Sequence, residues 1–369
     1  MAESSVHDMY HLWQECGDYG NRYIGWVEQL DSLDLTLVAA LQHAPRAPLT
    51  VLADVMETSA STVSRRLSRL LDDQLMRITS SVNWSLRGTG HPTVLWIDTR
   101  PELTRSVAAA LADLPEAQSV YIVTGDSTIR CLLHPPADGT VAGFVLDVIP
   151  QIPGVERISS NGILASSARS ADWMVPGVLD ADQVALLAEA RAPGGAETPP
   201  QLRPTELGVV DLLVGNGRAT AVQIAEELGI TRVTAARALE SVLGSGLVRP
   251  RIDIEPRHLG YPVEVFAQIS CAPSAIADLV VELGKHPNVR TAAMTAGSVA
   301  VAVQANVASE TALYEFVTAD LGGIDGITDV RLSTNLVTVK RNWNAVLPDG
   351  RLVPSSELPP LAGDRASEG

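Results

Sequence analysis

Apolar residues recur with a helical period through "SASTVSRRLSRLLDDQLMR", residues 59–77. The repeat falls at i, i+4, i+7 and i+8, which is typical of one buried helix face; its members are Val63, Leu67, Leu70 and Leu71. Ser59 or Ser61 can cap the start of this helix. The stretch therefore predicts an amphipathic helix, and its outer edge is basic. A solvated helix face would explain the same charges, so the arginines need a second argument.

The same pattern occurs twice along the chain. Residues 44–77 align with residues 216–249 at a constant offset of 172, and that offset also aligns Gly154 with Gly326. Self-similarity of this length predicts a unit duplicated in tandem. The aligned pairs in the helical part include Arg46 with Arg218, Thr62 with Thr234, and Arg65 with Arg237.

Each unit has a helical part followed by an alternating part. In the second unit, "TAVQIAEELG" and "TRVTAARALESVLGSG" are two helices joined by a short turn at "LGIT", with Gly229 ending the first. This order is typical of a helix-turn-helix, although a plain helical bundle gives a similar pattern. The next part of each unit follows the order β-α-β-β-α-β, as in ferredoxin-like domains. The predicted fold class is α+β, with two copies of a winged-type helix-turn-helix domain followed by a ferredoxin-like βαββαβ sensor domain.

The predicted boundaries follow from these patterns and from the Pro- and Gly-rich segment "APGGAETPPQLRP". We expect seven parts: an N-terminal extension (1–29), a first helix-turn-helix domain (30–80), a first ferredoxin-like ligand-sensing domain (90–168), a linker with a short helix (169–203), a second helix-turn-helix domain (204–256), a second ferredoxin-like ligand-sensing domain (260–341) and a disordered tail (342–369).

Three segments resemble the Lrp/AsnC family of bacterial transcription regulators. They are "LDSLDLTLVAALQHAPRAPLTVLADVMETSASTVSRRLSRL", "GLVRPRIDIEPRHLGYP" and "VTGDS" at 123–127. The resemblance covers residues 30–162 and 202–340 and is to a tandem double-unit form of the family. It implies DNA binding by the third helix of each helical part, sensing of an amino acid or a related small metabolite, and homo-oligomers (dimers or higher) that pair through the sensor sheets.

The candidate DNA contacts lie in the third helices. A helix that enters the major groove uses small polar residues to approach the bases and arginine to bind guanine or phosphate. In the first unit we expect Ser61, Thr62 and Arg65 to face bases, with Ser64 beside them, and Arg66, Arg69 and Arg46 to face phosphates. In the second unit the candidates are Arg232, Thr234 and Arg237. Glu240 makes this second helix the weaker candidate, and packing alone is the alternative.

The candidate ligand site is the turn after the second sensor strand. Glycine permits a close backbone approach there, and neighbouring N–H groups can bind a carboxylate. The acidic residue that the family has a few positions later is absent, with Arg130 and Val301 standing nearby, and an ordinary β-turn is the alternative. The candidates are Thr124, Gly125, Asp126 and Ser127 in the first unit, and Thr295, Gly297 and Ser298 in the second.

Composition and motifs limit the remaining possibilities. The 369 residues carry a net charge of −16, which argues against a protein that coats nucleic acid non-specifically but permits a local basic surface. Three distant cysteines, no secretion signal and no membrane-length apolar run favour a cytoplasmic protein without a membrane partner. We find no catalytic motif and expect neither an enzyme nor a cofactor. His7, His11 and Cys16 fit no zinc spacing, so we predict no metal site.

These observations favour a sequence-specific DNA-binding regulator that responds to a small-molecule effector, with double-stranded DNA as its partner. Two other classes stay open. One is a sensor or adaptor that does not bind DNA and whose helical domains contact proteins. The other is a small-molecule enzyme built on ferredoxin-like domains.

Overall fold

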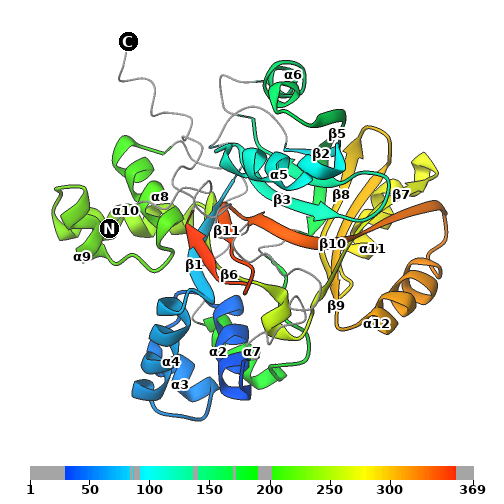
Figure 1. Ribbon diagram of the computed structural model, residues 1–369. Helices are drawn as coiled ribbons and strands as arrows, with labels where there is room; N and C mark the ends of the chain where they lie inside the picture. Colours follow the sequence, from blue (N-terminus) through cyan, green and yellow to red (C-terminus); the bar gives the residue numbers. More distant parts are fainter. Residues whose placement is uncertain are drawn as a thin grey trace. The chain divides into compact units, whose positions relative to one another are not determined.

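The structure is a computed structural model that describes residues 30–83, 86, 92–135, 140–168, 172–189 and 202–354 (Figure 1). The expected N-terminal extension, with His7, His11 and Cys16, lies outside these residues. The described residues divide into two compact units, and two separate parts of the chain contribute to each. One unit contains the helical parts of both halves of the sequence, and the other contains both alternating parts. Among the described residues, no helix is long and apolar enough to cross a membrane.

The helical unit contains two sets of three helices. The first three-helix set is α2 (Ser32–His43), α3 (Leu49–Val55) and α4 (Ala60–Asp72). The second three-helix set is α8 (Pro204–Gly215), α9 (Ala221–Glu227) and α10 (Arg232–Gly244). A further helix, α7 (Ala181–Glu189), packs against α2 and α3, where the Gln183 amide donates to the Val55 carbonyl over 2.8 Å.

A two-stranded ribbon joins the two sets. Strand β1 (Met76–Val82) follows the first set and pairs antiparallel with β6 (Val248–Ile254), which follows the second. Thr79 lies opposite Arg251, the residue that the 172-residue offset makes its equivalent. The ribbon therefore has an approximate two-fold axis at its centre, as in the interface of a symmetric dimer.

The first alternating part realises the expected β-α-β-β-α-β order. Its elements are β2 (Thr93–Thr99), α5 (Thr104–Asp113), β3 (Ala117–Val123), β4 (Ile129–Leu133), a helical segment from Val141 to Gln151 that begins with α6 (Val141–Gly143), and β5 (Val155–Ala168). α5 packs over β3, and its apolar face, which includes Val107 and Leu111, is buried there.

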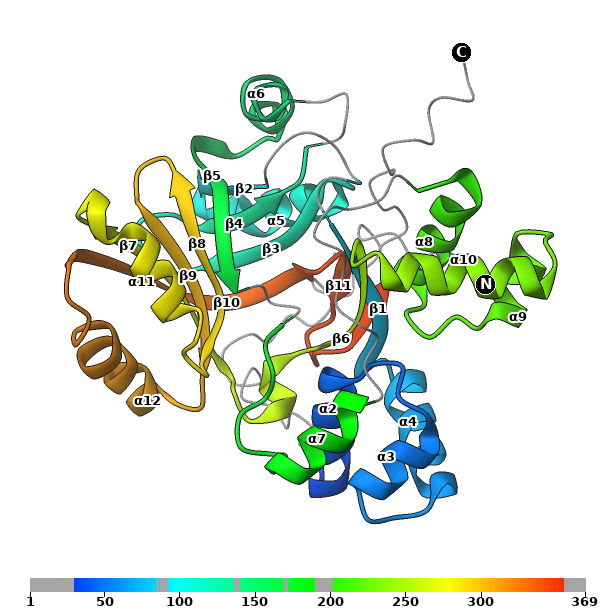
Figure 2. The same ribbon diagram turned by 180° about the vertical axis from the view of Figure 1, so that it is seen from behind.

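The second alternating part repeats the order and then continues. Its elements are β7 (Val263–Cys271), α11 (Ile276–Leu283), β8 (Val289–Ala296), β9 (Val301–Val307), α12 (Glu310–Glu315), β10 (Ile327–Arg341), β11 (Asn344–Val346) and β12 (Leu352–Pro354). In Figure 2, α11 and α12 lie beside β8 and β9. β11 and β12 extend the sheet beyond β10, so the expectation of a disordered tail is wrong for residues 342–354. Residues 355–369 lie outside the described residues.

All ten strands described in this unit belong to one sheet. The order is β12-β11-β10-β3-β4-β2-β5-β8-β9-β7, and β10 also pairs with β7. The first half of β10 pairs with β7 and its second half with β3, while β5 pairs first with β2 and then with β8. β5 and β10 are the last strands of the two β-α-β-β-α-β parts. Because each pairs with strands of both parts, they join the two sensor parts into one closed ring of paired strands.

Candidate nucleic-acid interface and sensor turns

The start of α4 presents small polar groups and one arginine. Ser59 caps the helix by accepting a hydrogen bond from the Thr62 backbone N–H over 3.2 Å. Ser61 and Arg65 are exposed, and Thr62 and Ser64 are partly exposed. Val63 and Leu67 point into the core, as the sequence pattern predicts. This surface has the residue types that a helix in the major groove needs.

Arg66 and Arg69, on the same helix, are bound within the protein. The Asp34 side chain, on α2, is only 1% exposed and accepts hydrogen bonds from Arg66, over 2.8 Å, and from Arg69. Arg66 also donates to the Asp31 carboxylate over 2.7 Å. A buried carboxylate requires such partners. The two arginines therefore tie α4 to α2, a role that the sequence pattern did not indicate.

Arg46 is also bound within the protein. Its guanidinium donates to the carbonyls of Gly217 and Ala219 over 2.6 and 3.0 Å. Arg218, its equivalent, donates to the carbonyls of Pro45 and Ala47, both over 2.9 Å. The two arginines thus make the same reciprocal contact between the three-helix sets. Burial lowers the pKa of both side chains, Arg46 and Arg218. A phosphate contact by Arg46 stays a prediction, and these carbonyls already take up its terminal nitrogens.

The start of α10 is more open than that of α4. Thr231 caps the helix by accepting from the Thr234 N–H over 3.2 Å. Arg232, Thr234 and Arg237 are all exposed. Val233 between them is 62% exposed.

The buried acid of the second set is Glu206, on α8. It accepts a hydrogen bond from the Arg203 guanidinium over 2.8 Å, and its carboxylate also accepts from the Arg203 backbone N–H. Hydrogen bonds from Arg203 and from Ser241 lower the pKa of Glu206 to about 2, against the effect of burial. Arg203 is the N-cap residue of α8, so the arginine that binds this acid does not come from α10.

The first sensor turn packs against β10. Gly125 has a φ of +103°, and an added Cβ would lie 2.8 Å from the Ser333 hydroxyl, so glycine is required there. The Thr124 N–H donates to the Thr334 carbonyl over 2.9 Å, and the two threonine hydroxyls lie 2.8 Å apart. Asp126 is exposed and Ser127 is half-buried beside it.

The second sensor turn packs against β5 in the equivalent way. An added Cβ on Gly297 would collide with the Asn161 side chain. Asn161 also accepts from the Ser298 N–H over 2.8 Å, and the Thr295 hydroxyl donates to the Val299 carbonyl over 2.7 Å. In both turns, therefore, backbone groups that we expected to hold a ligand have protein partners. Ligand binding by these residues stays a prediction.

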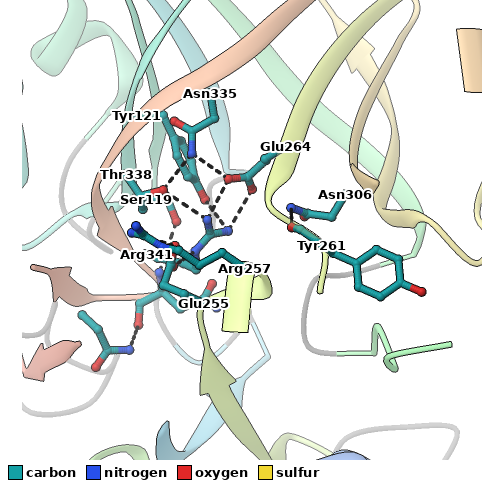
Figure 3. A network of polar contacts seen from close by, with 12 residues as sticks. Ser119, Tyr121, Glu255, Arg257, Tyr261, Glu264, Asn306, Asn335, Thr338 and Arg341 are labelled. Atoms are coloured by element: carbon teal, nitrogen blue, oxygen red, sulfur yellow. Dashed lines mark hydrogen bonds and ion pairs between the residues drawn. The ribbon is translucent and has the colours of Figure 1, made fainter. Parts of the chain in front are cut away.

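A buried ionic network joins the sensor parts (Figure 3). The Arg341 guanidinium binds both oxygens of Glu264, over 2.9 and 2.7 Å, and also binds Glu255. Asn335 donates to Glu264 over 2.8 Å, and Tyr121 lies under the guanidinium. Burial would raise the pKa of Glu264, but the charge and hydrogen bonds of Arg341 lower it to about 2. The pair is thus charged and saturated with hydrogen bonds, as a buried ion pair must be.

Two further buried arginines lie near this network. Arg130 stacks on Phe266, with its guanidinium carbon 4.4 Å from the ring centroid. Arg290 lies over the Trp173 ring at 5.4 Å, and two of its nitrogens, Nε and Nη1, are buried without a hydrogen-bond partner. Burial lowers the pKa of both arginines.

Buried positive charge exceeds buried negative charge in this unit. Four cationic side chains are buried among its described residues, against two carboxylates: Arg130, Arg290, Lys340 and Arg341, against Glu255 and Glu264. The Lys340 ammonium donates to the carbonyls of Ala112 and Leu114 at the end of α5, and burial lowers its pKa to about 8.

The sequence patterns did not lead us to predict these buried charged residues. A signal was present, because Arg130 and Arg290 are each the only charged residue of their strand, "IRCLL" and "VRTAAMTA". Their partners could not be read from the sequence, since Phe266 and Trp173 are far from them along the chain. No cluster of three or more His, Cys, Asp or Glu side chains suited to a metal ion occurs in the part of the chain that the structure describes.

Two parts of the chain match domains of known proteins. Residues 30–71 match the AsnC-type helix-turn-helix domain, and residues 264–344 match the Lrp/AsnC ligand binding domain. The transcriptional regulator LrpA of Pyrococcus abyssi is 25% identical over 130 residues, which cover 35% of this chain and 92% of LrpA. The regulatory protein AsnC of Escherichia coli is 32% identical over 78 residues, 20% of this chain and 51% of AsnC.

Solved structures of the siroheme decarboxylase NirDL are similar over most of the chain. The siroheme decarboxylase NirDL, in complex with an iron-uroporphyrin III analogue, has a TM-score of 0.56 and 12% identity. The match covers 84% of this chain and 93% of the NirDL chain. At this identity the likeness concerns the fold alone.

Proposed function

We propose a function for this chain from the premise that it belongs to the Lrp/AsnC family, because it carries that family's helix-turn-helix and ligand-binding domains. Its relatives include HTH-type transcriptional regulators of one such unit. The chain is accordingly a DNA-binding transcription regulator that responds to a ligand.

We infer further that the chain is two such units in tandem. The 172-residue offset, the two three-helix sets and the two β-α-β-β-α-β parts support this arrangement. The reciprocal contacts of Arg46 and Arg218 and the β1–β6 ribbon, which resemble those of a symmetric dimer, also support it. One chain would thus supply both DNA-reading helices, and further copies would assemble into a homo-oligomer.

The observation that carries the DNA proposal is the pair Arg65 and Arg237, equivalent and exposed near the starts of α4 and α10. An arginine there can donate two hydrogen bonds to guanine. Thr62 and Thr234, one turn earlier, stand beside them. We assign base contacts to these four residues and to Ser61, with Ser64 and Arg232 at the edge of the same surface.

Selection of bound sequences from random duplex DNA by the purified chain tests this proposal. The selection is run at about 50 and 200 mM salt, since phosphate contacts make affinity fall steeply with salt. We expect one enriched motif, with affinity that drops by about tenfold or more between the two conditions. Absence of any enriched motif at both salt concentrations would favour the adaptor class instead.

For the effector we propose a small molecule with a carboxylate, such as an amino acid. The excess of buried positive charge and the two unpartnered nitrogens of Arg290 support an anion, because an unpartnered buried charge is costly. The equivalent of Arg290 in the first sensor part is Gln118, which carries no charge and is hydrogen-bonded to His134 over 2.5 Å. Calorimetry with amino acids and dicarboxylates tests this. Binding that Arg290→Gln abolishes would support the assignment, whereas tight binding of neutral ligands only would contradict it.

We propose that the chain is not an enzyme and acts in the cytoplasm. The similarity to NirDL leaves an enzyme as the alternative, because NirDL has this fold and is a decarboxylase. The buried arginines would also suit a substrate with several carboxylates. Release of carbon dioxide from a uroporphyrin-type tetrapyrrole by the purified chain would favour the enzyme, and its absence alongside DNA binding would favour the regulator.

A further inference from the structure

The two three-helix sets are related by an approximate two-fold axis, but they are not identical. Arg46 contacts the carbonyls of residues 217 and 219, and Arg218 contacts those of residues 45 and 47, which are the same positions after the 172-residue offset. In a homodimer this symmetry would make both reading helices equal. Here both sets belong to one chain, so a substitution can alter one set without altering the other.

The exposed starts of α4 and α10 share some residues and differ in others. Thr62 and Arg65 in α4 correspond to the same residue types, Thr234 and Arg237, in α10. The neighbouring positions differ: Ala60 corresponds to Arg232, Ser61 to Val233, and Ser64 to Ala236.

These differences change the chemistry that each helix offers to a base pair. The Ser61 hydroxyl can donate to or accept from several bases. Val233, 62% exposed, can make only an apolar contact, which in the major groove suits the methyl group of thymine. Arg232, exposed at the first position of α10, adds a cation that α4 lacks, since Ala60 stands at that position.

The internal contacts increase the difference. Arg66 and Arg69 of α4 bind the buried Asp34, so their charge is directed inward. Their equivalents in α10, Ala238 and Ser241, carry no charge. The cations of α4 that face outward are thus centred on Arg65, whereas those of α10 are Arg232 and Arg237.

We propose that this chain binds a directional DNA operator with two unlike half-sites. The half-sites share the bases that Arg65 and Arg237 read and differ at the neighbouring position, where the second half-site carries thymine opposite Val233. This inference rests on the proposed function and names the class of operator within it. It follows from the fusion of two diverged reading helices in one chain.

The enriched motif from the random-DNA selection is the first test. We expect two half-sites about one helical turn apart, roughly 34 Å, with a shared guanine and one unlike neighbouring base pair. A perfect palindrome would overturn the proposal and leave the proposed function intact. A selection without any motif would overturn the proposed function, and this inference with it, so the two failures are distinguishable.

A swap of one side chain is the second test. Val233→Ser gives α10 the residue of α4, and the variant should lose about fivefold or more in affinity for the thymine-bearing operator. It should regain affinity for a symmetrised operator with two first-type half-sites. Val281→Ser, at a valine of α11 that is 49% exposed, is the matched control and should bind both operators as the parent does. Equal affinity of parent and Val233→Ser for both operators would overturn the proposal.

Discussion

The two three-helix sets neutralise an equivalent buried acid with different side chains. Each buries one acid of its first helix, Asp34 in α2 and Glu206 in α8. The first set neutralises it with two arginines of α4, and the second uses Arg203, at the start of α8 itself. The fold is therefore the same, while the third helix contributes its charge to the interior in one set and keeps it on the surface in the other.

This comparison shows why a count of charges along a helix misleads. The sequence of α4 has three arginines within five residues, 65–69, and α10 has one in the equivalent stretch. The structure directs two of the three in α4 toward Asp34 and leaves Arg65 exposed. The cations that face outward are therefore centred on Arg65 in α4 and are Arg232 and Arg237 in α10, so the helix with more arginines in this stretch directs fewer of them outward.

Removal of the buried acid should give the largest difference between the sets. Asp34→Ala leaves Arg66 and Arg69 without their shared partner beside the core, and we expect a loss of about 2–3 kcal/mol in the free energy of unfolding. Glu206→Ala should cost about half as much, because Arg203 is 73% exposed and is rehydrated easily. Thermal unfolding by circular dichroism measures both, and equal losses would contradict the asymmetry.

Arg46 and Arg218 should contribute equally to stability, in contrast to the two buried acids. Arg46→Met and Arg218→Met each remove two hydrogen bonds to carbonyls between the sets, and each should cost about 1–2 kcal/mol. Calorimetric unfolding of the two variants tests the approximate symmetry. A loss of DNA affinity by Arg46→Met far beyond that of Arg218→Met would instead indicate a phosphate contact by Arg46 alone.

Acid should weaken both units through Glu206 and Glu264. The pKa of each carboxyl is about 2 in the folded protein, below its usual 4.5. Their stabilising contributions are therefore complete above pH 4.5 and are lost as the pH falls from 4.5 toward 2, since the unfolded state then binds more protons. Melting temperatures at pH 5, 4 and 3 measure the loss. A Glu206→Gln variant should show a smaller decrease over this range than the parent, and an identical decrease would contradict the role of Glu206.

The turns before α4 and α10 should show the smallest difference in stability. Glu57 has a φ of +50°, where its equivalent Gly229 has +62°. A left-handed conformation is costly for glutamate and free for glycine. Glu57→Gly should raise the stability of the first set by about 0.5–1 kcal/mol, and Gly229→Ala should lower that of the second by a similar amount. Chemical denaturation measures both changes. A destabilised Glu57→Gly would mean that the Glu57 side chain has a role that outweighs its strain.

The sequence predicted local elements better than the pairing between distant parts. The cap at Ser59 and the buried positions Val63, Leu67 and Leu70 of α4 follow from neighbouring residues and are as expected, whereas Leu71, expected on the same face, is 36% exposed. The Asp34 contacts, the Arg46–Arg218 exchange and the Glu264–Arg341 pair join residues 32 to 173 positions apart. No local pattern specifies such partners. The strands β11 and β12 were missed for a related reason, because the sheet edge at β10 orders a Pro-rich segment that has little β preference of its own.

The most direct measurement compares Arg65→Ala with Arg66→Ala, two adjacent residues on α4, for DNA affinity and for thermal stability. Arg65 is exposed, so its loss should weaken binding to the selected operator by about tenfold and leave the melting temperature unchanged. Arg66 binds Asp31 and Asp34, so its loss should lower the melting temperature. Full DNA affinity of Arg65→Ala would contradict the assignment of α4 as a reading helix.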